Sequence, residues 1–238
     1  IVRSMTTRLD DLPHTGAMRY ADGVERVPAV AISTVGAARL SGLLSQGVPV
    51  RVRLRLDCRT LPDVPSANVV GEIVGSERPE EVLVVGGHID AWDKGVGAHD
   101  DGAGCAQSIE AARLILACGL RPRRTIRVVL FTNEENGLRG GRAYSEAHAE
   151  ELDRHVMALE SDRGGFLPRG FTTDANPAAL AALRRAAAPL ETVGAATVRP
   201  GGGGADISPL AAAGVPLVGL WPDSSRYFDV HHCERDTL

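Results

Sequence analysis

Short apolar segments alternate with polar and amphipathic segments along most of this chain. A continuous apolar run is typical of a strand that is covered on both faces of a sheet. Such runs predict strands at Val82–Val85, Thr125–Phe131, Val156–Leu159 and Val215–Leu220. Apolar residues at helical spacing predict helices over 103–117, 140–152 and 177–188. The alternation of strand and helix predicts an α/β fold, a three-layer sandwich around a mixed, largely parallel central sheet.

Two further segments are predicted as strands. Val50–Leu56 alternates apolar with charged residues, as expected of a strand with one exposed face, and Asn68–Val74 is a second strand. The first 48 residues differ from the rest. They contain one predicted strand over 27–33 and one predicted helix over 35–46, which Gly47 ends. This unit has too few partners to form a domain alone, so we expect a boundary after residue 48 and a main domain over 49–238.

Composition, charge and cysteine spacing argue against several classes of protein. The 238 residues carry a net charge of -4 and no cluster of basic and aromatic residues, which argues against a nucleic-acid partner. No apolar run approaches the ~20 residues that a membrane span needs. The four cysteines do not have the C-x-x-C spacing of a structural zinc site. The chain opens on Ile1, without an initiator Met or a signal peptide, and we expect a fragment or a processed chain.

Carboxylates and imidazoles follow the predicted strands. In open α/β sheets, ligands bind beyond the carboxyl ends of the strands, so these side chains are expected to meet there. Carboxylate oxygens and imidazole nitrogens, without thiolates, are typical ligands of a two-metal hydrolytic site. The candidates are His88 with Asp90, the pair Asp100–Asp101, the pair Glu134–Glu135, Asp162, and the pair His231–His232.

The ordered set of motifs around these residues resembles the M28 metallopeptidases. The resemblance extends from the first residues to the C-terminus, and the set as a whole is specific although each motif alone is weak. The matching motifs are Gly86-Gly-His-Ile-Asp-Ala-Trp-Asp93, Gly97-Ala-His-Asp-Asp-Gly-Ala-Gly104, Asn133-Glu-Glu-Asn-Gly137, Leu159-Glu-Ser-Asp-Arg-Gly164 and the segment from Tyr227 to Thr237.

The resemblance implies two zinc ions. One would take His88, Asp100 and Asp162, and the other Asp100, Glu135 and His232, with the Asp100 carboxylate bridging them. Glu134 corresponds to the general base and Asp90 to the carboxylate that orients His88. The Asp236-Thr237 pair selects His232 rather than His231 as the ligand. The family also implies a cis peptide bond between Asp100 and Asp101.

Three residues keep open roles. Asp206 would contact substrate or support its loop, and Tyr227 would donate to the oxyanion or pack beside the site. His231 would contact a metal ligand or line the pocket. The glycine run from Gly201 to Gly204 precedes Asp206 and predicts a loop at the mouth of the site.

The function implied by the resemblance is a di-zinc exopeptidase. It would hydrolyse short peptides or dipeptides with a metal-bridging hydroxide, as a carboxypeptidase or dipeptidase. Other members of the family imply aminopeptidase action. A glutaminyl-cyclase-like acyltransferase with a single zinc and a non-catalytic binding module are further alternatives. The resemblance also makes residues 1–48 the C-terminal part of an inserted protease-associated domain, and it implies a secreted or periplasmic location. A homodimer is a further expectation.

Overall fold

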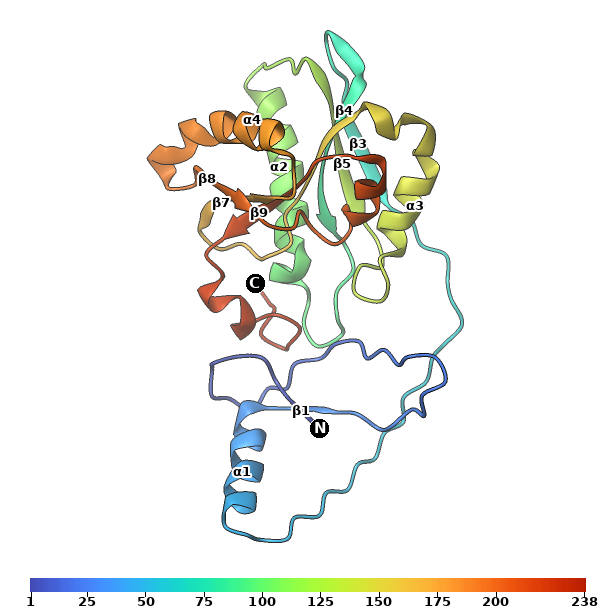
Figure 1. Ribbon diagram of the computed structural model, residues 1–238, viewed down its shortest axis with the longest axis vertical. Helices are drawn as coiled ribbons and strands as arrows, with labels where there is room; N and C mark the ends of the chain where they lie inside the picture. Colours follow the sequence, from blue (N-terminus) through green and yellow to red (C-terminus); the bar gives the residue numbers. More distant parts are fainter.

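The computed structural model describes residues 1–238 and contains one seven-stranded sheet (Figure 1). The strands lie in the order β3-β5-β4-β6-β9-β7-β8. Their bounds are β3 Val69–Ile73, β4 Arg78–His88, β5 Arg124–Phe131, β6 His155–Glu160, β7 Pro168–Thr173, β8 Thr197–Pro200 and β9 Leu217–Pro222. Pairing is parallel except between β3 and β5 and between β7 and β9. The predicted mixed, largely parallel sheet is confirmed.

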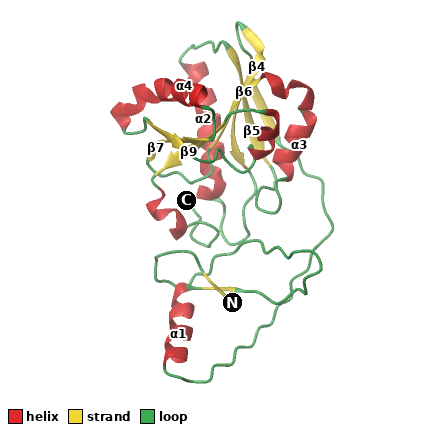
Figure 2. Ribbon diagram, in the orientation of Figure 1, coloured by secondary structure: helices red, strands yellow, loops and turns green.

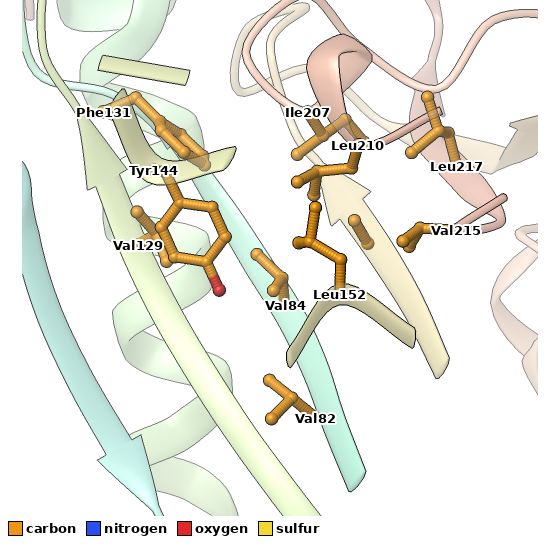
Figure 3. Packing of buried hydrophobic residues seen from close by; sticks show 11 residues of the cluster. Val82, Val84, Val129, Phe131, Tyr144, Leu152, Ile207, Leu210, Val215 and Leu217 are labelled. Atoms are coloured by element: carbon orange, nitrogen blue, oxygen red, sulfur yellow. The ribbon is translucent and has the colours of Figure 1, made fainter. Parts of the chain in front are cut away.

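Helices cover both faces of this sheet. The side chains of Val128 and Leu130 line a hollow with helix α2 (Ala103–Ala117). Side chains alternate along a strand, so Val129 and Phe131 point to the opposite face. There they join a buried apolar cluster with Tyr144 of helix α3 (Arg139–Ala147), shown in Figure 3. The sheet is therefore the middle layer of the predicted sandwich.

The remaining helical segments lie between the strands, except for the last, which follows β9. Helix α4 (Pro177–Ala187) begins where the sequence predicts, because the Asn176 side chain accepts hydrogen bonds from the backbone N–H groups of Ala178 and Ala179, both at 3.0 Å. The short segments are η1 (Ala98–Gly102), η2 (Ala149–Arg154), η3 (Ala188–Val193), η4 (Ser208–Ala213) and η5 (Ser224–Asp229). None of the helices combines the length and the apolar character that a membrane crossing requires.

The predicted strand at Val50–Leu56 is wrong. Residues 51–56 are exposed, Val50 is half-buried, and no strand pairs with the segment. Alternation alone cannot make a strand without a partner for its backbone hydrogen bonds. The sequence analysis also missed β7 and β8, which are short and rich in Pro, Gly, Arg and Thr rather than continuously apolar.

The N-terminal part lies beside the carboxyl ends of the strands (Figures 1 and 2). It contains two short parallel strands, β1 (Val2–Arg3) and β2 (Ala31–Ile32), and helix α1 (Thr34–Ser45). Ser33 caps α1 by accepting a hydrogen bond from Gly36 N–H at 3.0 Å. An extended segment over residues 46–68 then returns to the sheet at β3.

Candidate metal centre

The five predicted metal ligands gather at the carboxyl edge of the sheet. His88 is the last residue of β4, while Glu135 and Asp162 follow the ends of β5 and β6. Neighbouring parallel strands end at one edge, so the residues that follow them lie close together. The loops before α2 and after η5 bring in the other two. We call this set the ligand cluster: His88, Asp100, Glu135, Asp162 and His232.

Asp100 lies between the two imidazoles. Its Oδ1 is 3.2 Å from His88 Nε2, and its Oδ2 is 3.3 Å from His232 Nε2. The two oxygens of one buried carboxylate therefore face two different ring nitrogens, as in a carboxylate that bridges two cations. The peptide bond between Asp100 and Asp101 is cis, as the family resemblance implies.

Each imidazole faces a second carboxylate through the same nitrogen. His88 Nε2 is 3.4 Å from Asp162 Oδ1, and His232 Nε2 is 3.1 Å from Glu135 Oε2. Potential ligand atoms of His88, Asp100 and Glu135 all lie within 4.8 Å of one another, as do those of His88, Asp101 and Asp162 and those of Asp100, His231 and His232. The contacts of the two imidazoles, His88 with Asp100 and Asp162 and His232 with Asp100 and Glu135, define two halves of the cluster that share Asp100.

The electrostatics of the cluster favour cations. Asp100 Oδ2, Glu135 Oε1 and Asp162 Oδ1 are buried and have no hydrogen-bond partner. A buried carboxylate oxygen is costly unless a charge or a donor compensates it. Burial would lower the pKa of His88, but the nearby carboxylates of Asp100 and Asp162 outweigh burial and raise it. The oxygens that favour a proton on the imidazole would equally favour a cation, so the residues fit a metal site.

The outer ring nitrogens of the two histidines both face backbone carbonyls. His88 Nδ1 is 2.8 Å from the backbone oxygen of Asp90. His232 Nδ1 is 3.3 Å from the backbone oxygen of Thr15. Such a contact turns Nδ1 into the donor and leaves the Nε2 lone pair for the cluster. Both imidazoles are therefore oriented for metal binding through Nε2.

The structure differs from the role predicted for Asp90. Its carboxylate is 3.8 Å from His88 Nδ1, beyond hydrogen-bond distance. The Asp90 oxygens instead accept hydrogen bonds from the backbone N–H groups of Glu134 at 2.9 Å and Glu135 at 3.2 Å. The backbone of Asp90 orients His88, and its side chain holds the glutamate loop.

Glu134 lies half-buried beside the cluster. Burial, reinforced by the Asp162 carboxylate, raises the pKa of Glu134 to about 7, although the charge of His88 opposes the shift. A carboxylate with this pKa can accept and release a proton near neutral pH. This is the property that a general base requires.

Two positioning residues were missed in the sequence analysis. Asp236 is buried, and its carboxylate accepts hydrogen bonds from His99 N–H at 2.5 Å and Asp100 N–H at 3.1 Å. Glu160 is buried and accepts from Ala205 N–H at 2.9 Å and Ile207 N–H at 3.0 Å, which fixes the glycine-rich loop. A carboxylate that accepts hydrogen bonds only from backbone groups leaves no spacing pattern in the sequence. Asp236 was noted only as part of the Asp236-Thr237 pair that selects His232, and not for its own contacts.

The three residues with open roles lie in different places. His231 stacks on His232 with ring centroids 3.6 Å apart, and its Nε2 is 3.6 Å from Asp100 Oδ2. Tyr227 lines a pocket beside Asp162. Asp206 is 1% exposed and its side-chain oxygens have no partner, and burial raises its pKa to about 9. Asp206 does not line the pocket, and its burial argues for a neutral, supporting side chain.

That pocket adjoins the ligand cluster. It has a volume of about 540 Å³ and is bounded by Asp162, Arg163, Tyr227, Phe228 and the backbone of Gly202–Gly204. The glycine-rich loop therefore forms part of its wall, as predicted for the mouth of the site.

The sequence pattern of peptidase family M28 matches residues 68–238. The chain belongs to this family of metallopeptidases. Within it, the chain is 39% identical to carboxypeptidase Q from Homo sapiens over 238 residues, which are all of this chain and 50% of the relative. It is 40% identical to carboxypeptidase Q from Mus musculus over 226 residues, or 95% of this chain and 48% of that protein.

Solved structures agree with this assignment. The peptidase M28 precursor from Shewanella amazonensis has a TM-score of 0.93 and 40% identity, covering 99% of this chain and 53% of that one. A zinc aminopeptidase from Bacillus subtilis shares the fold, with a TM-score of 0.59 and 23% identity over 71% of this chain and 44% of that one. The chain spans about half the length of the relatives it matches.

Proposed function

We propose that this chain forms the catalytic centre of a di-zinc exopeptidase that hydrolyses dipeptides or other short peptides. The single observation that carries the proposal is the position of Asp100, whose two carboxylate oxygens face His88 at 3.2 Å and His232 at 3.3 Å. One cation would be held by His88, Asp100 and Asp162. The other would be held by Asp100, Glu135 and His232. Membership of the M28 family and the unpartnered carboxylate oxygens support zinc as the metal.

The reaction needs an activated water and a proton carrier. Two zinc ions held there would act as Lewis acids that lower the pKa of water and polarise the scissile carbonyl. Glu134 takes a proton as the water oxygen bonds to the carbonyl carbon, and it gives this proton to the amine nitrogen as the C–N bond breaks. The Asp90 carboxylate keeps Glu134 in place through the backbone N–H at 2.9 Å.

The polarity of the pocket beside Asp162 supports carboxypeptidase or dipeptidase action. Arg163 contributes a positive charge to its lining and makes no ion pair, whereas nearby Arg169 is paired with Asp223 at 2.8 Å. A free guanidinium favours a carboxylate, with which it forms charge-assisted hydrogen bonds. The C-terminal carboxylate of a short peptide has this chemistry. The human and mouse relatives named carboxypeptidase Q point the same way.

Two alternatives differ in what they predict. Aminopeptidase action would make the free amino terminus essential and the free carboxylate dispensable. A glutaminyl-cyclase-like acyltransferase would use one zinc, whereas the cluster offers ligands for two. Metal stoichiometry and matched peptides with blocked termini therefore separate the three activities.

Glu134→Gln tests the proposed chemistry. The amide cannot take a proton from water, so we expect hydrolysis of a dipeptide to fall by ~10²–10⁴-fold while two zinc ions stay bound. Turnover by the purified protein with and without a chelator, together with metal analysis, measures both effects. Glu150→Gln, in an exposed position away from the cluster, is the matched control. Full activity of the Glu134 variant would overturn the base assignment, and a chelator-resistant enzyme would overturn the metal mechanism.

Location and assembly complete the proposal. The solved Shewanella relative is described as a precursor, which supports export of this protein to a secreted or periplasmic location. A homodimer is part of the same proposal. Fractionation of cells and light scattering of the full-length protein test these two points.

A further inference from the structure

The N-terminal segment contacts the loop that carries His232. Thr6 Oγ1 donates to Asp229 Oδ1 at 3.2 Å, and Arg235 Nε donates to Asp10 Oδ2 at 3.2 Å. These two contacts lie on either side of His232 in the sequence. The first residues of the chain and its last loop therefore form one packed unit beside the ligand cluster.

Thr15 contacts His232 at two points. Its N–H donates to the backbone oxygen of His232 at 2.8 Å, and its backbone oxygen lies 3.3 Å from His232 Nδ1. His232 has a φ of 56°, in the left-handed region that residues other than glycine seldom adopt. Such a conformation persists only where surrounding contacts hold it. The pair of contacts from Thr15 holds both the backbone and the ring.

Thr15 is itself anchored by buried groups. Ser4 Oγ accepts a hydrogen bond from the N–H of His14 at 2.9 Å and donates to Ile32 O at 2.8 Å. Ser4 and His14 are both buried. The pairing of β1 with β2 fixes the position of Ser4, because Ser4 N–H continues this ladder to Ile32 at 2.9 Å. The contact with His232 therefore rests on a small folded unit rather than on a free terminus.

We propose that the segment Ser4–Thr15 is a structural part of the metal centre and that Thr15 is a positioning residue for His232. This inference rests on the proposed function. The Thr15 carbonyl fixes the ring with Nδ1 as donor and Nε2 toward Asp100 and Glu135. The cation half that uses His232 depends on the N-terminal segment, and the half that uses His88 and Asp162 does not, because the Asp90 backbone orients His88.

Proline at position 15 tests the proposal because it removes the N–H that bonds to His232. In the full-length Thr15→Pro protein we expect one of two zinc-binding steps to weaken by ~10–100-fold, the usual effect of losing an outer partner of a ligand. The other step stays within about twofold of its original affinity. Competition with a chromophoric chelator measures both steps, and His232→Gln identifies the step that belongs to His232.

Two further variants distinguish loss of the Thr15 contact from a general effect of proline on folding. Ala17→Pro places proline nearby in the same segment, where the N–H makes no hydrogen bond, and zinc binding should not change. Ser4→Ala loosens the anchor without a proline, and it should weaken the same step as Thr15→Pro even if the proline variant folds poorly. Imidazole ¹H–¹⁵N spectra of the zinc-loaded protein add a readout other than affinity, since His232 resonances should shift more than those of His88.

The outcomes separate this inference from the proposed function. Failure of the unmodified protein to bind two zinc ions would overturn the proposed function. Two normal binding steps in both Thr15→Pro and Ser4→Ala would overturn the role of the segment. Equal weakening of both steps in both variants would also overturn it, because the effect would then be general.

Discussion

The two halves of the ligand cluster use the same chemistry, but the backbone partners of their imidazoles lie at very different separations along the sequence. In each half an imidazole turns Nε2 to carboxylates and Nδ1 to a backbone carbonyl. For His88 that carbonyl belongs to Asp90, two residues further along the chain. For His232 it belongs to Thr15, 217 residues away in the sequence. The orientation of His88 needs only β4 and its loop, whereas that of His232 also needs the N-terminal segment to dock.

Asp100 is the element that the halves share. Its backbone N–H is held by Asp236, and its oxygens face one imidazole each. The carboxylate of Asp236 also accepts from His99 N–H. The C-terminal loop therefore supplies His232 and also holds Asp100, the residue that the two halves share.

The largest effect is expected from Asp100→Asn, because this substitution changes the residue that both halves of the ligand cluster share. The amide keeps the shape of the side chain but loses the negative charge and one acceptor oxygen. We expect zinc affinity in both steps to fall by more than the ~10–100-fold that loss of an outer partner costs, and hydrolysis to be lost with it. Zinc titration of the purified variant measures this.

Asp101→Asn is the neighbouring control. Asp101 accepts hydrogen bonds from His88 N–H at 3.1 Å and Gly104 N–H at 3.0 Å, so its substitution should lower stability more than the number of ions bound. If Asp100→Asn still binds two ions tightly, the halves do not share this residue.

Asp90→Asn is expected to have an intermediate effect, and it separates the role of the Asp90 side chain from that of its backbone. The amide leaves the backbone oxygen of residue 90 facing His88, but it sets an NH₂ group against the N–H of Glu134 or Glu135. We expect turnover to fall by ~10–100-fold, with the zinc step of the His88 half unchanged. Stability should fall by about 1–3 kcal/mol because a buried donor loses its acceptor.

Steady-state kinetics, zinc titration and thermal unfolding measure these three effects for Asp90→Asn. Asp93→Asn is the control, since Asp93 is exposed in the same loop and makes no hydrogen bond. Loss of the His88 zinc step in Asp90→Asn would mean that the carboxylate, and not the backbone, orients this ligand.

The residues of the centre that follow strands were more accessible to sequence reasoning than those in irregular segments. His88 and the Glu134–Glu135 pair follow continuous apolar runs, and such runs predict both a buried strand and the edge where it ends. Asp100 and His232 lie in irregular loops, so periodicity gave no position for them and only the motif did. The contact of Thr15 with His232 left no signal, because backbone groups carry no sequence identity.

The errors in the strand predictions also arose where the sequence pattern does not reflect the contacts that a segment makes. The core strands were predicted because burial on both faces demands apolar residues. Strand β7 pairs on an outer part of the sheet with the sequence Pro-Arg-Gly-Phe-Thr-Thr, which lacks such a run. The alternating segment Val50–Leu56 had the pattern of a strand but has no partner strand in the fold.

The smallest effect is expected from Arg163→Met. This variant tests whether the substrate carboxylate lies beside the His88 half of the ligand cluster. Arg163 follows Asp162 of the ligand cluster and lines the adjoining pocket of about 540 Å³. Methionine keeps much of the length but removes the charge. For a dipeptide with a free C-terminus we expect KM to rise by about tenfold, in line with the ~1.5–3 kcal/mol of a hydrogen bond to a charged group, with kcat nearly unchanged.

Matched peptides identify the group that Arg163 contacts. A dipeptide with an amidated C-terminus should be cleaved equally by the original protein and the variant, because it lacks the carboxylate. An amidated dipeptide with an acidic side chain that is also sensitive to Arg163→Met would assign the contact to the side chain. Arg169→Met is the control, since Arg169 pairs with Asp223 and lies outside the pocket lining. An unchanged KM for all three peptides would remove Arg163 from the substrate site and, with it, the argument that the carboxylate lies on the His88 side.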